Sequence, residues 1–91
     1  MASTVTNNSA HNRFEMETPA GLAVADYRVD GRTMTIFHTK VPVGLRGRGY
    51  GARLVLGALV EARRLGIKVV PQCWFVREFV DRHPAFADVL R

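Results

Sequence analysis

The strongest chemical signal in the sequence is a short stretch, residues 41–55, that holds three arginines, four glycines and one tyrosine. Arginine binds phosphate through paired, charge-assisted hydrogen bonds. Glycine lets the backbone adopt a positive φ angle and approach an anion closely. The stretch therefore predicts a site for a phosphate or a similar anion.

The position of this stretch supports the same interpretation. Threonine, isoleucine, phenylalanine and valine favour an extended strand before it. After it, apolar residues recur at three- and four-residue spacing from about 50 to 65, as in an amphipathic helix. The first turn of a helix presents amide groups without partners and a partial positive charge. A purely structural glycine-rich turn and a disordered nucleic-acid-binding arm are the alternatives, although an arm would not need a helix directly after it.

Cys73 and His38 are the side chains that could carry out chemistry beside this stretch. Each falls near the carboxyl end of a predicted strand, where open α/β sheets bind ligands. Cys73 also begins a predicted helix, which could lower its pKa, and an inert buried cysteine is the alternative. His38 is a candidate base, or a hydrogen-bonded residue that fixes the strand end. Alternation along the strand predicts that His38 shares a face with Met34 and Ile36.

The arginine–glycine stretch contains the pattern R-x-x-G-x-G at residues 46–51. It lacks the Gly-Lys-Ser/Thr ending of a Walker loop, and it is not the G-x-G-x-x-G fingerprint of dinucleotide-binding folds. Together with HTKVP at 38–42 and VPQCWFVREFVDRHP at 70–84, it resembles the GNAT superfamily of acetyltransferases. The similarity is greatest to the very small, single-domain GNAT-like proteins, and it extends from about Arg13 to Leu90.

This resemblance implies that acetyl-CoA is the cofactor and that its acetyl group is transferred to an amine of unknown identity. The backbone amides of residues 46–51 would hold the pyrophosphate, and Val41 would pair with the pantetheine arm. The implied cofactor-binding residues are Val41, Arg46, Gly47, Arg48, Gly49, Tyr50 and Gly51. Cys73 would act as an acid toward the departing thiolate or as an acyl-accepting nucleophile, and His38 as the base.

Pro71 agrees with the resemblance for a separate physical reason. A proline in a central strand removes a donor from the hydrogen-bond ladder, so we expect the strand pairing to fail there. In the GNAT fold two parallel strands separate at this level and admit the pantetheine arm. The sequence feature and the family feature therefore coincide.

Three residues depart from the family pattern. Relatives usually carry an acidic residue where this chain has Lys40, so the acceptor would be anionic or the activity lost. Many relatives have tyrosine where this chain has Phe75 and Phe79, so a hydroxyl that could serve as an acid is missing. The chain is also too short for the elements that shape the acceptor site of larger GNAT enzymes. A CoA-binding module with little turnover is therefore an alternative function, and the open acceptor side leaves room for a partner chain.

The periodicity of the sequence predicts the elements that position these residues. Strands are expected at 13–18, 22–29, 32–41 and 67–70, and helices at 50–65 and 74–82, with a short C-terminal turn at 84–90. The order β-β-β-α-β-α predicts an α+β or α/β fold on a mixed sheet, which corresponds to a minimal GNAT fold. A right-handed crossover would make the last strand parallel to the one before it. Residues 13–91 are expected to form the domain, and residues 1–12 a flexible arm.

Composition restricts the function classes further. The chain is 47% hydrophobic, which is too apolar for a disordered protein. Its net charge of +5 keeps nucleic-acid association as a third functional alternative, which the sequence supports less than the other two. Arginine outnumbers lysine eleven to two, which slightly favours an anionic ligand, although a GC-rich coding sequence would give the same bias.

The cysteine count and hydropathy indicate where the protein works. One cysteine, Cys73, allows neither an internal disulfide nor a thiolate metal cluster, so no metal site is expected and a reducing compartment suits the chain. No apolar run reaches membrane-spanning length, and residues 1–12 lack the core of a signal peptide. The sequence thus predicts a cytoplasmic protein that does not enter a membrane.

Overall fold

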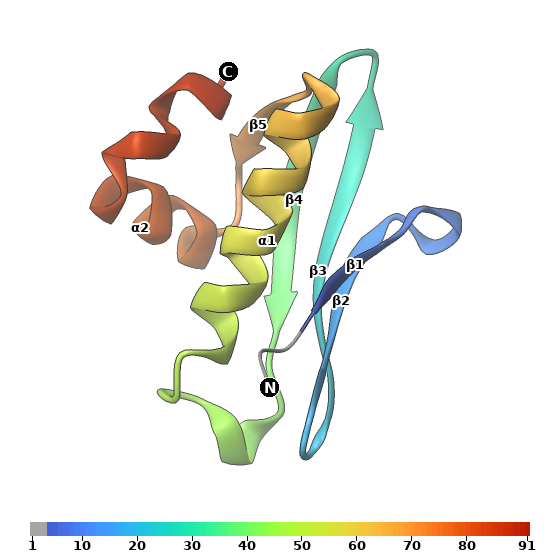
Figure 1. Cartoon of the computed structure of the whole chain (residues 1–91), viewed down its shortest axis with the longest axis vertical. Coiled ribbons are helices and arrows are strands. Elements are labelled where there is room, and N and C mark those ends of the chain that lie inside the picture. Colours follow the sequence, from blue (N-terminus) through green and yellow to red (C-terminus); the bar gives the residue numbers. More distant parts are fainter. Residues whose placement is uncertain (1–3) are drawn as a thin grey trace.

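In the computed structural model, residues 4–91 are described, and they form a five-stranded mixed sheet with helices packed against it (Figure 1). The strands are β1 (Val5–Asn8), β2 (Arg13–Thr18), β3 (Gly21–Asp30), β4 (Thr33–Lys40) and β5 (Lys68–Pro71). The α-helices are α1 (Tyr50–Leu65) and α2 (Trp74–Arg82), and short 3-10 turns span Ser9–His11, Val43–Leu45 and Pro84–Val89. The strands lie in chain order, antiparallel from β1 to β4, with β5 parallel to β4. The predicted mixed sheet is confirmed.

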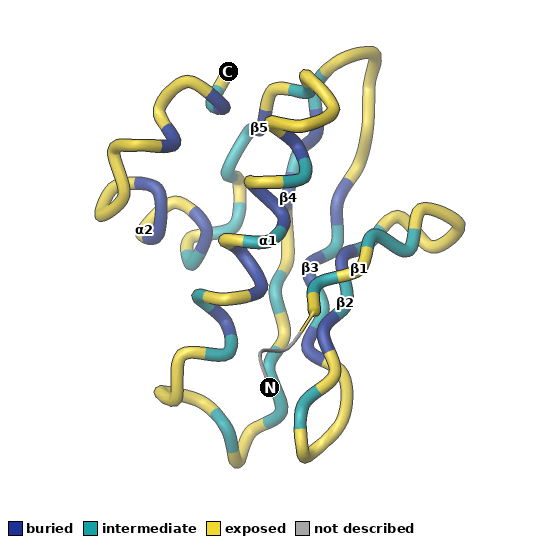
Figure 2. Tube along the Cα trace, viewed as in Figure 1, coloured by how far each residue is buried: buried dark blue, intermediate teal, exposed yellow. Residues whose placement is uncertain are grey.

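The sheet buries the residues whose alternation predicted it. One face of β2, β3 and β4 is apolar, and its buried side chains are Phe14, Met16, Ala23, Ala25, Tyr27, Met34 and Ile36. Because side chains in a strand alternate between the two faces, these residues point to the same side. The buried positions follow the central strands and the inner side of α1 (Figure 2). This shared apolar face holds α1 on the sheet.

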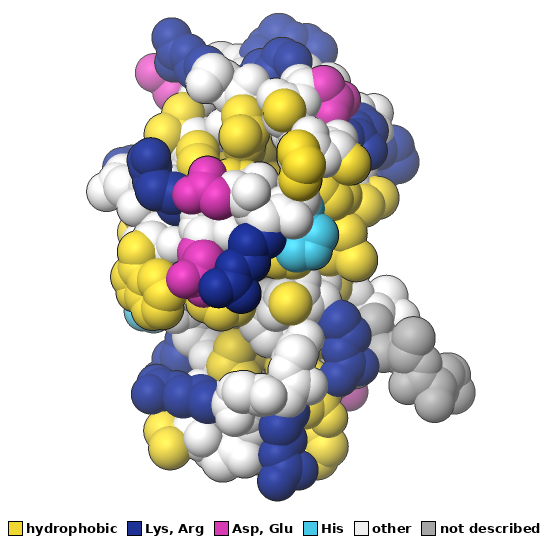
Figure 3. All heavy atoms as spheres, turned by 90° about the vertical axis from the view of Figure 1, so that its left-hand side faces the viewer, with side chains coloured by type: hydrophobic (Ala, Val, Ile, Leu, Met, Phe, Trp, Pro, Cys, Tyr) yellow, Lys and Arg dark blue, Asp and Glu magenta, His cyan; other side chains and the backbone are white. Residues whose placement is uncertain are grey.

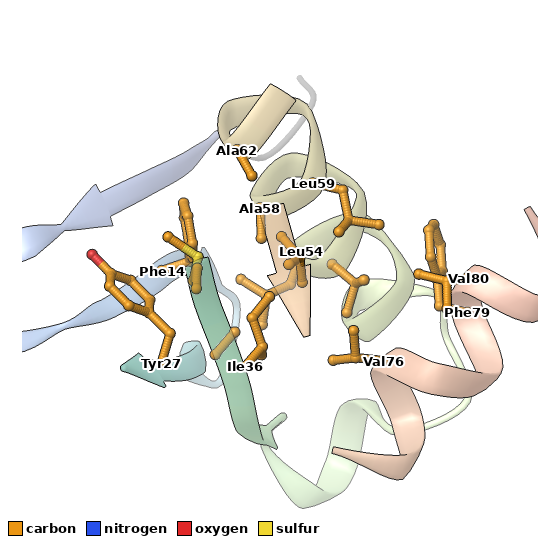
Figure 4. Packing of buried hydrophobic residues seen from close by; sticks show 14 of the residues in the cluster. Phe14, Tyr27, Ile36, Leu54, Ala58, Leu59, Ala62, Val76, Phe79 and Val80 are labelled. Atoms are coloured by element: carbon orange, nitrogen blue, oxygen red, sulfur yellow. The ribbon is translucent and has the colours of Figure 1, made fainter. Parts of the chain in front are cut away.

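Helix α1 covers that face with one side. Its buried residues Leu54, Val55, Ala58, Leu59 and Ala62 repeat at helical spacing, and Leu54 and Ala58 lie close to Ile36 (Figure 4). Gly66 ends the helix in the left-handed conformation that glycine favours there. The helix begins beside the carboxyl end of β4, so its first turn lies at the end of the sheet that the sequence predicts for the site.

Helix α2 extends the same core past the edge of the sheet. Val76, Phe79 and Val80 are buried and point toward α1 (Figure 4). None of the helices in residues 4–91 is long and apolar enough to cross a membrane. Phe79 belongs to this core, where its ring packs on His83 and Phe86.

Strand β1 differs from the expected flexible arm. Residues 5–8 pair with β2, with Val5 opposite Met16. The close approach of β1 to α1 depends on Gly57, because a Cβ atom there would lie 2.5 Å from Cβ of Val5. A glycine inside a helix costs about 1 kcal/mol relative to alanine, so this packing contact explains its position. Residues 1–3 of the expected arm lie outside the described residues.

Strand β4 and the segment that runs from β5 into the start of α2 divide into two parts, which we call the closed half and the open half. In the closed half, residues 33–36 pair with residues 68–71 in a parallel ladder. In the open half, residues 37–40 of β4 and residues 72–75 no longer pair with one another. The expected separation of the two parallel strands is therefore present at this level.

The separation has a cause that the sequence did not reveal. The amide of Lys68 donates to the carbonyl of Arg32, so a regular ladder would have the amide of Gln72 donate to Ile36. The amide of Gln72 instead donates to the carbonyl of Val70, and the amide of Cys73 donates to the carbonyl of Ile36. Both hydrogen bonds are 3.0 Å long. One extra residue is thereby inserted, and the chain turns away from β4.

Pro71 plays a different part from the expected one. Amide groups alternate in direction along a strand, and the Lys68 amide points toward β4. The donor that Pro71 lacks would therefore point away from β4, so its absence does not break the β4–β5 ladder. The expectation that it does is wrong, and the turn at Gln72 ends the pairing.

Candidate functional site

A cavity of about 930 Å³ lies at the open half, between the ends of β4 and β5 and the first turn of α1. We call it the site cavity. Its lining residues are Phe37, His38, Thr39, Val41, Leu45, Arg46, Gly47, Gly49, Gly51, Ala52, Gln72, Cys73, Trp74 and Phe75. The site cavity thus joins the arginine–glycine loop to both predicted catalytic residues. Segments more than 20 residues apart in the sequence meet there only because β5 returns parallel to β4.

The loop at one end of the site cavity has the conformation that glycine requires. Gly47 and Gly49 have φ angles of +80° and +85°, which other residues rarely adopt. A Cβ atom at either position would meet nothing within 4 Å, so both glycines face open space. They therefore serve the backbone conformation of the loop rather than packing.

Gly51 has a different reason to be glycine. It lies inside α1, and a Cβ atom there would lie 2.8 Å from the Phe75 ring and 3.5 Å from Val41. The missing side chain lets these residues pack against the first turn of the helix. Sequence spacing alone grouped Gly51 with Gly47 and Gly49, but the lack of a side chain at Gly51 serves packing at the wall of the site cavity.

The first turn of α1 offers backbone donors and positive charge. Among the described residues, no side chain caps the helix at Gly49, so its first amides are free to donate to a ligand. Arg46 lines the site cavity, whereas Arg48 and Tyr50 do not. The Tyr50 ring packs instead under the guanidinium of Arg53, at 4.5 Å. Lys and Arg side chains are prominent on the lower part of the molecule, where this loop lies (Figures 1 and 3).

Cys73 lies at the other end of the site cavity, directly before α2. Its side chain is partly buried, and Sγ is 3.6 Å from Oγ1 of Thr39. Burial raises the pKa of Cys73, but hydrogen bonds from Thr39 and from the backbone of Val76 and Phe75 outweigh it, so the pKa lies below its usual value. The arrangement favours a reactive thiol over an inert core residue.

A bulge in β4 decides where His38 points. Tyr27 pairs with Ile36, but the next pair is Asp26 with His38, so Phe37 is an extra residue. Thr39 then pairs with Ala25, which is buried beneath α1. His38 consequently faces the side of the sheet away from α1, and Thr39 faces Cys73.

The expectation that His38 shares a face with Met34 and Ile36 is therefore wrong. Strict alternation holds only for a regular strand, and the bulge reverses it after Ile36. His38 Nδ1 lies 3.0 Å from Oδ2 of Asp26, a residue that the sequence did not single out. Both side chains are partly exposed, His38 at 55% and Asp26 at 30%.

Other residues of the site cavity were also missed from the sequence. Phe37, Leu45 and Gln72 line it, and none of them was singled out as a site residue, although Leu45 and Gln72 lie within the stretches 41–55 and 70–84. Phe75 lines it as well, while Phe79 is in the core, so only one of these two departures from the family pattern bears on the site cavity. Within residues 4–91, no three His, Cys, Asp or Glu side chains gather as metal ligands.

Comparisons with known proteins identify the family and the fold. Residues 13–89 match the family described as GCN5-related N-acetyl-transferase. Protein NATD1 from cattle (Bos taurus) is 32% identical over 82 residues, which are 89% of this chain and 65% of NATD1. The NMR structure of a GCN5-like candidate N-acetyltransferase from Staphylococcus aureus has a similar fold, with a TM-score of 0.68. That similarity covers 96% of this chain and 86% of the other at 24% sequence identity.

Proposed function

Because the chain belongs to the GCN5-related N-acetyltransferase family, we propose that it binds acetyl-CoA in the site cavity and transfers the acetyl group to an amine. The observation that carries this proposal is the shape of the site cavity. A positively charged loop and a helix N-terminus lie at one end, and a thiol of lowered pKa lies at the other. An acyl donor with a phosphate-rich tail would match both ends, with its phosphates at the positive loop and its acyl group at the thiol.

The residues present fit the pyrophosphate of acetyl-CoA. Gly47 and Gly49 leave open space in front of the backbone, and the uncapped first turn of α1 supplies amide donors. Arg46 adds a full positive charge at the same place. Arg48 and Tyr50 would act from outside the site cavity, and Val41 would lie beside the pantetheine arm.

Bound acetyl-CoA supplies an activated thioester, so the protein has to position an amine and manage protons. Cys73 lines the site cavity and has a lowered pKa, and in this proposal it donates a proton to the leaving sulfur or accepts the acyl group. His38 lines the same site cavity, and in this proposal it takes a proton from the amine. The product would be an acetamide, with the proton lost by the amine balanced by the proton gained by sulfur.

The acceptor itself is not carried over from the relatives, since the chain spans 65% of the length of NATD1. Lys40 pairs with Val24 on the face away from α1, the same face as His38, so it adds positive charge there. An acceptor with a negative group beside its amine would suit this surface. We also propose that the protein is located in the cytoplasm, where acetyl-CoA is available.

Titration with acetyl-CoA by calorimetry tests the proposal, at about 50 mM and about 200 mM salt. We expect micromolar binding that Gly49→Val and Arg46→Glu abolish. Gly44→Ala is the matched control, because Gly44 also faces open space but does not have a positive φ angle. It should bind as the unchanged protein does.

Two other outcomes identify the alternative functions. Binding of acetyl-CoA without transfer to any amine in a screen would indicate a CoA-binding module. Absence of binding, together with association with RNA that weakens steeply with salt, would replace the proposal with a nucleic-acid-associated role.

A further inference from the structure

Asp26 and His38 form a hydrogen-bonded pair that the bulge in β4 creates. In a regular register, the residue opposite Asp26 would be Phe37. Because Phe37 is an extra residue in β4, His38 lies opposite Asp26 instead. The two side chains therefore lie on the same face of the sheet, and Nδ1 of His38 is 3.0 Å from Oδ2 of Asp26. Bulges commonly re-aim a single side chain beside a functional site.

The carboxylate dictates which nitrogen of the imidazole carries the proton. An ionised carboxylate only accepts hydrogen bonds, so Nδ1 of His38 must be the donor. In a neutral ring, Nε2 then keeps a free lone pair. Asp26 therefore selects the one tautomer in which Nε2 can act as a base.

The two residues differ in their access to the site cavity. His38 lines it together with Cys73 and Gln72, whereas Asp26 is not among the lining residues. Both lie on the face of the sheet away from α1, and within the described residues no helix covers that face (Figure 1). An amine that approaches from this face would reach His38 before Cys73, and Asp26 could act only through His38.

We propose that Asp26 is a positioning residue that holds His38 in the Nδ1–H tautomer, with Nε2 directed to the amine acceptor. The proposal rests on the acetyl-transfer function for its catalytic part, but its structural part stands without that function. As the amine nitrogen forms its bond to the acetyl carbon, it loses one proton, and Nε2 of His38 receives it. The electron pair of the former N–H bond stays on nitrogen, and the carbon–sulfur bond of the thioester breaks with its electron pair on sulfur. CoA thereby leaves as a thiolate, which takes up a proton, and the product amide is neutral.

The tautomer can be measured directly on the free protein by long-range ¹H–¹⁵N NMR correlation at alkaline pH, where imidazole rings are neutral. We expect His38 to be the Nδ1–H form, with the His38→Gln spectrum assigning its signals. Asp26→Leu should shift His38 toward the Nε2–H form. His83 is an internal control, because its Nδ1 donates to the carbonyl of Phe79 and should not respond.

Asp30→Leu is the matched control variant. Asp30 lies on the same strand and the same face as Asp26, four residues further along, and faces Thr33. Its replacement should leave the His38 tautomer unchanged. The positioning role would be overturned if His38 is the Nε2–H form in the unchanged protein. It would also be overturned if Asp26→Leu leaves the His38 tautomer unchanged.

A double-mutant cycle tests the catalytic part, with acetyl-CoA and glycylglycine as the probe acceptor. Asp26→Leu should lower kcat by about 10- to 100-fold, the size of effect known for partners that orient metal-bound imidazoles, and leave acetyl-CoA affinity unchanged. In the His38→Gln background the same change should have no further effect. An independent loss in that background would overturn the mechanism through His38.

Failure of the two proposals can be told apart. If the unchanged protein transfers no acetyl group to any amine, the proposed function and the base role of His38 both fail. The NMR result would still establish or overturn the positioning of His38 by Asp26.

Discussion

The closed half and the open half are consecutive stretches of the same two chain segments, yet they have opposite properties. In the closed half, Met34, Ile36 and Val69 are 1% exposed or less and the ladder is regular. In the open half, His38 and Cys73 line the site cavity and make hydrogen bonds outside any ladder. The change takes place within one or two residues on each strand.

The comparison shows that the site forms where one extra residue interrupts the regular pairing on each of the two segments. On β4 the extra residue is Phe37, and on β5 the turn at Gln72 inserts one as well. Both occur just after the last regular pair, Ile36 with Pro71. Because a bulge reverses which side chains face the core, polar groups appear at the point where burial stops. Stability and chemistry should therefore respond to different substitutions in the two halves.

The largest effect that would sharpen this comparison is expected in the open half. Cys73→Ala should lower acetyl transfer by about 100-fold or more if the thiol moves a proton or accepts the acyl group, and it should spare acetyl-CoA binding. Transfer to an amine would be followed by release of free CoA, and binding by calorimetry. Cys73→Ser keeps a polar hydrogen and is the matched variant. Unchanged turnover in the alanine variant would rule out a catalytic Cys73.

In the closed half, Ile36→Ala should reduce stability instead. The Ile36 side chain is fully buried between the sheet and α1, so its truncation should lower the free energy of unfolding by about 2–5 kcal/mol. Urea denaturation followed by circular dichroism measures the change. Acetyl-CoA affinity of the folded protein should stay the same, and a loss of affinity without loss of stability would break the separation of the two halves.

The smallest predicted effect concerns the pKa of Cys73. Thr39→Val removes the hydroxyl that hydrogen-bonds to Sγ, which should raise the pKa of Cys73 and leave less thiolate at neutral pH. Alkylation with iodoacetamide should then be about two- to fivefold slower near pH 7 and approach the unchanged rate at high pH. Thr35→Val is the control, because Thr35 lies in the closed half opposite Val70. Equal rates at every pH would show that Thr39 does not tune the thiol.

The sequence predicted most of the fold for a simple reason. Alternation marked β2, β3 and β4, and helical spacing marked α1 and α2, because each of these elements buries one continuous apolar face. Strand β1 escaped notice because its four residues, VTNN, show little apolar pattern. Its place depends on Gly57, far along the chain, which leaves room for Val5 against α1.

The sequence also determined the chemistry available to the site: the arginine–glycine loop before a helix, one thiol at a strand–helix junction, and a histidine near a strand end. Local composition and order suffice for these, since each is a property of neighbouring residues. Only the tertiary structure decided how these groups face one another. The bulge at Phe37 turned His38 toward Asp26 and Thr39 toward Cys73, and Gly51 proved to make room for Phe75. The register between strands depends on backbone hydrogen bonds that pair distant residues. A shift of one residue moves every following side chain to the other face of the sheet, and the periodicity of the sequence does not reveal such a shift.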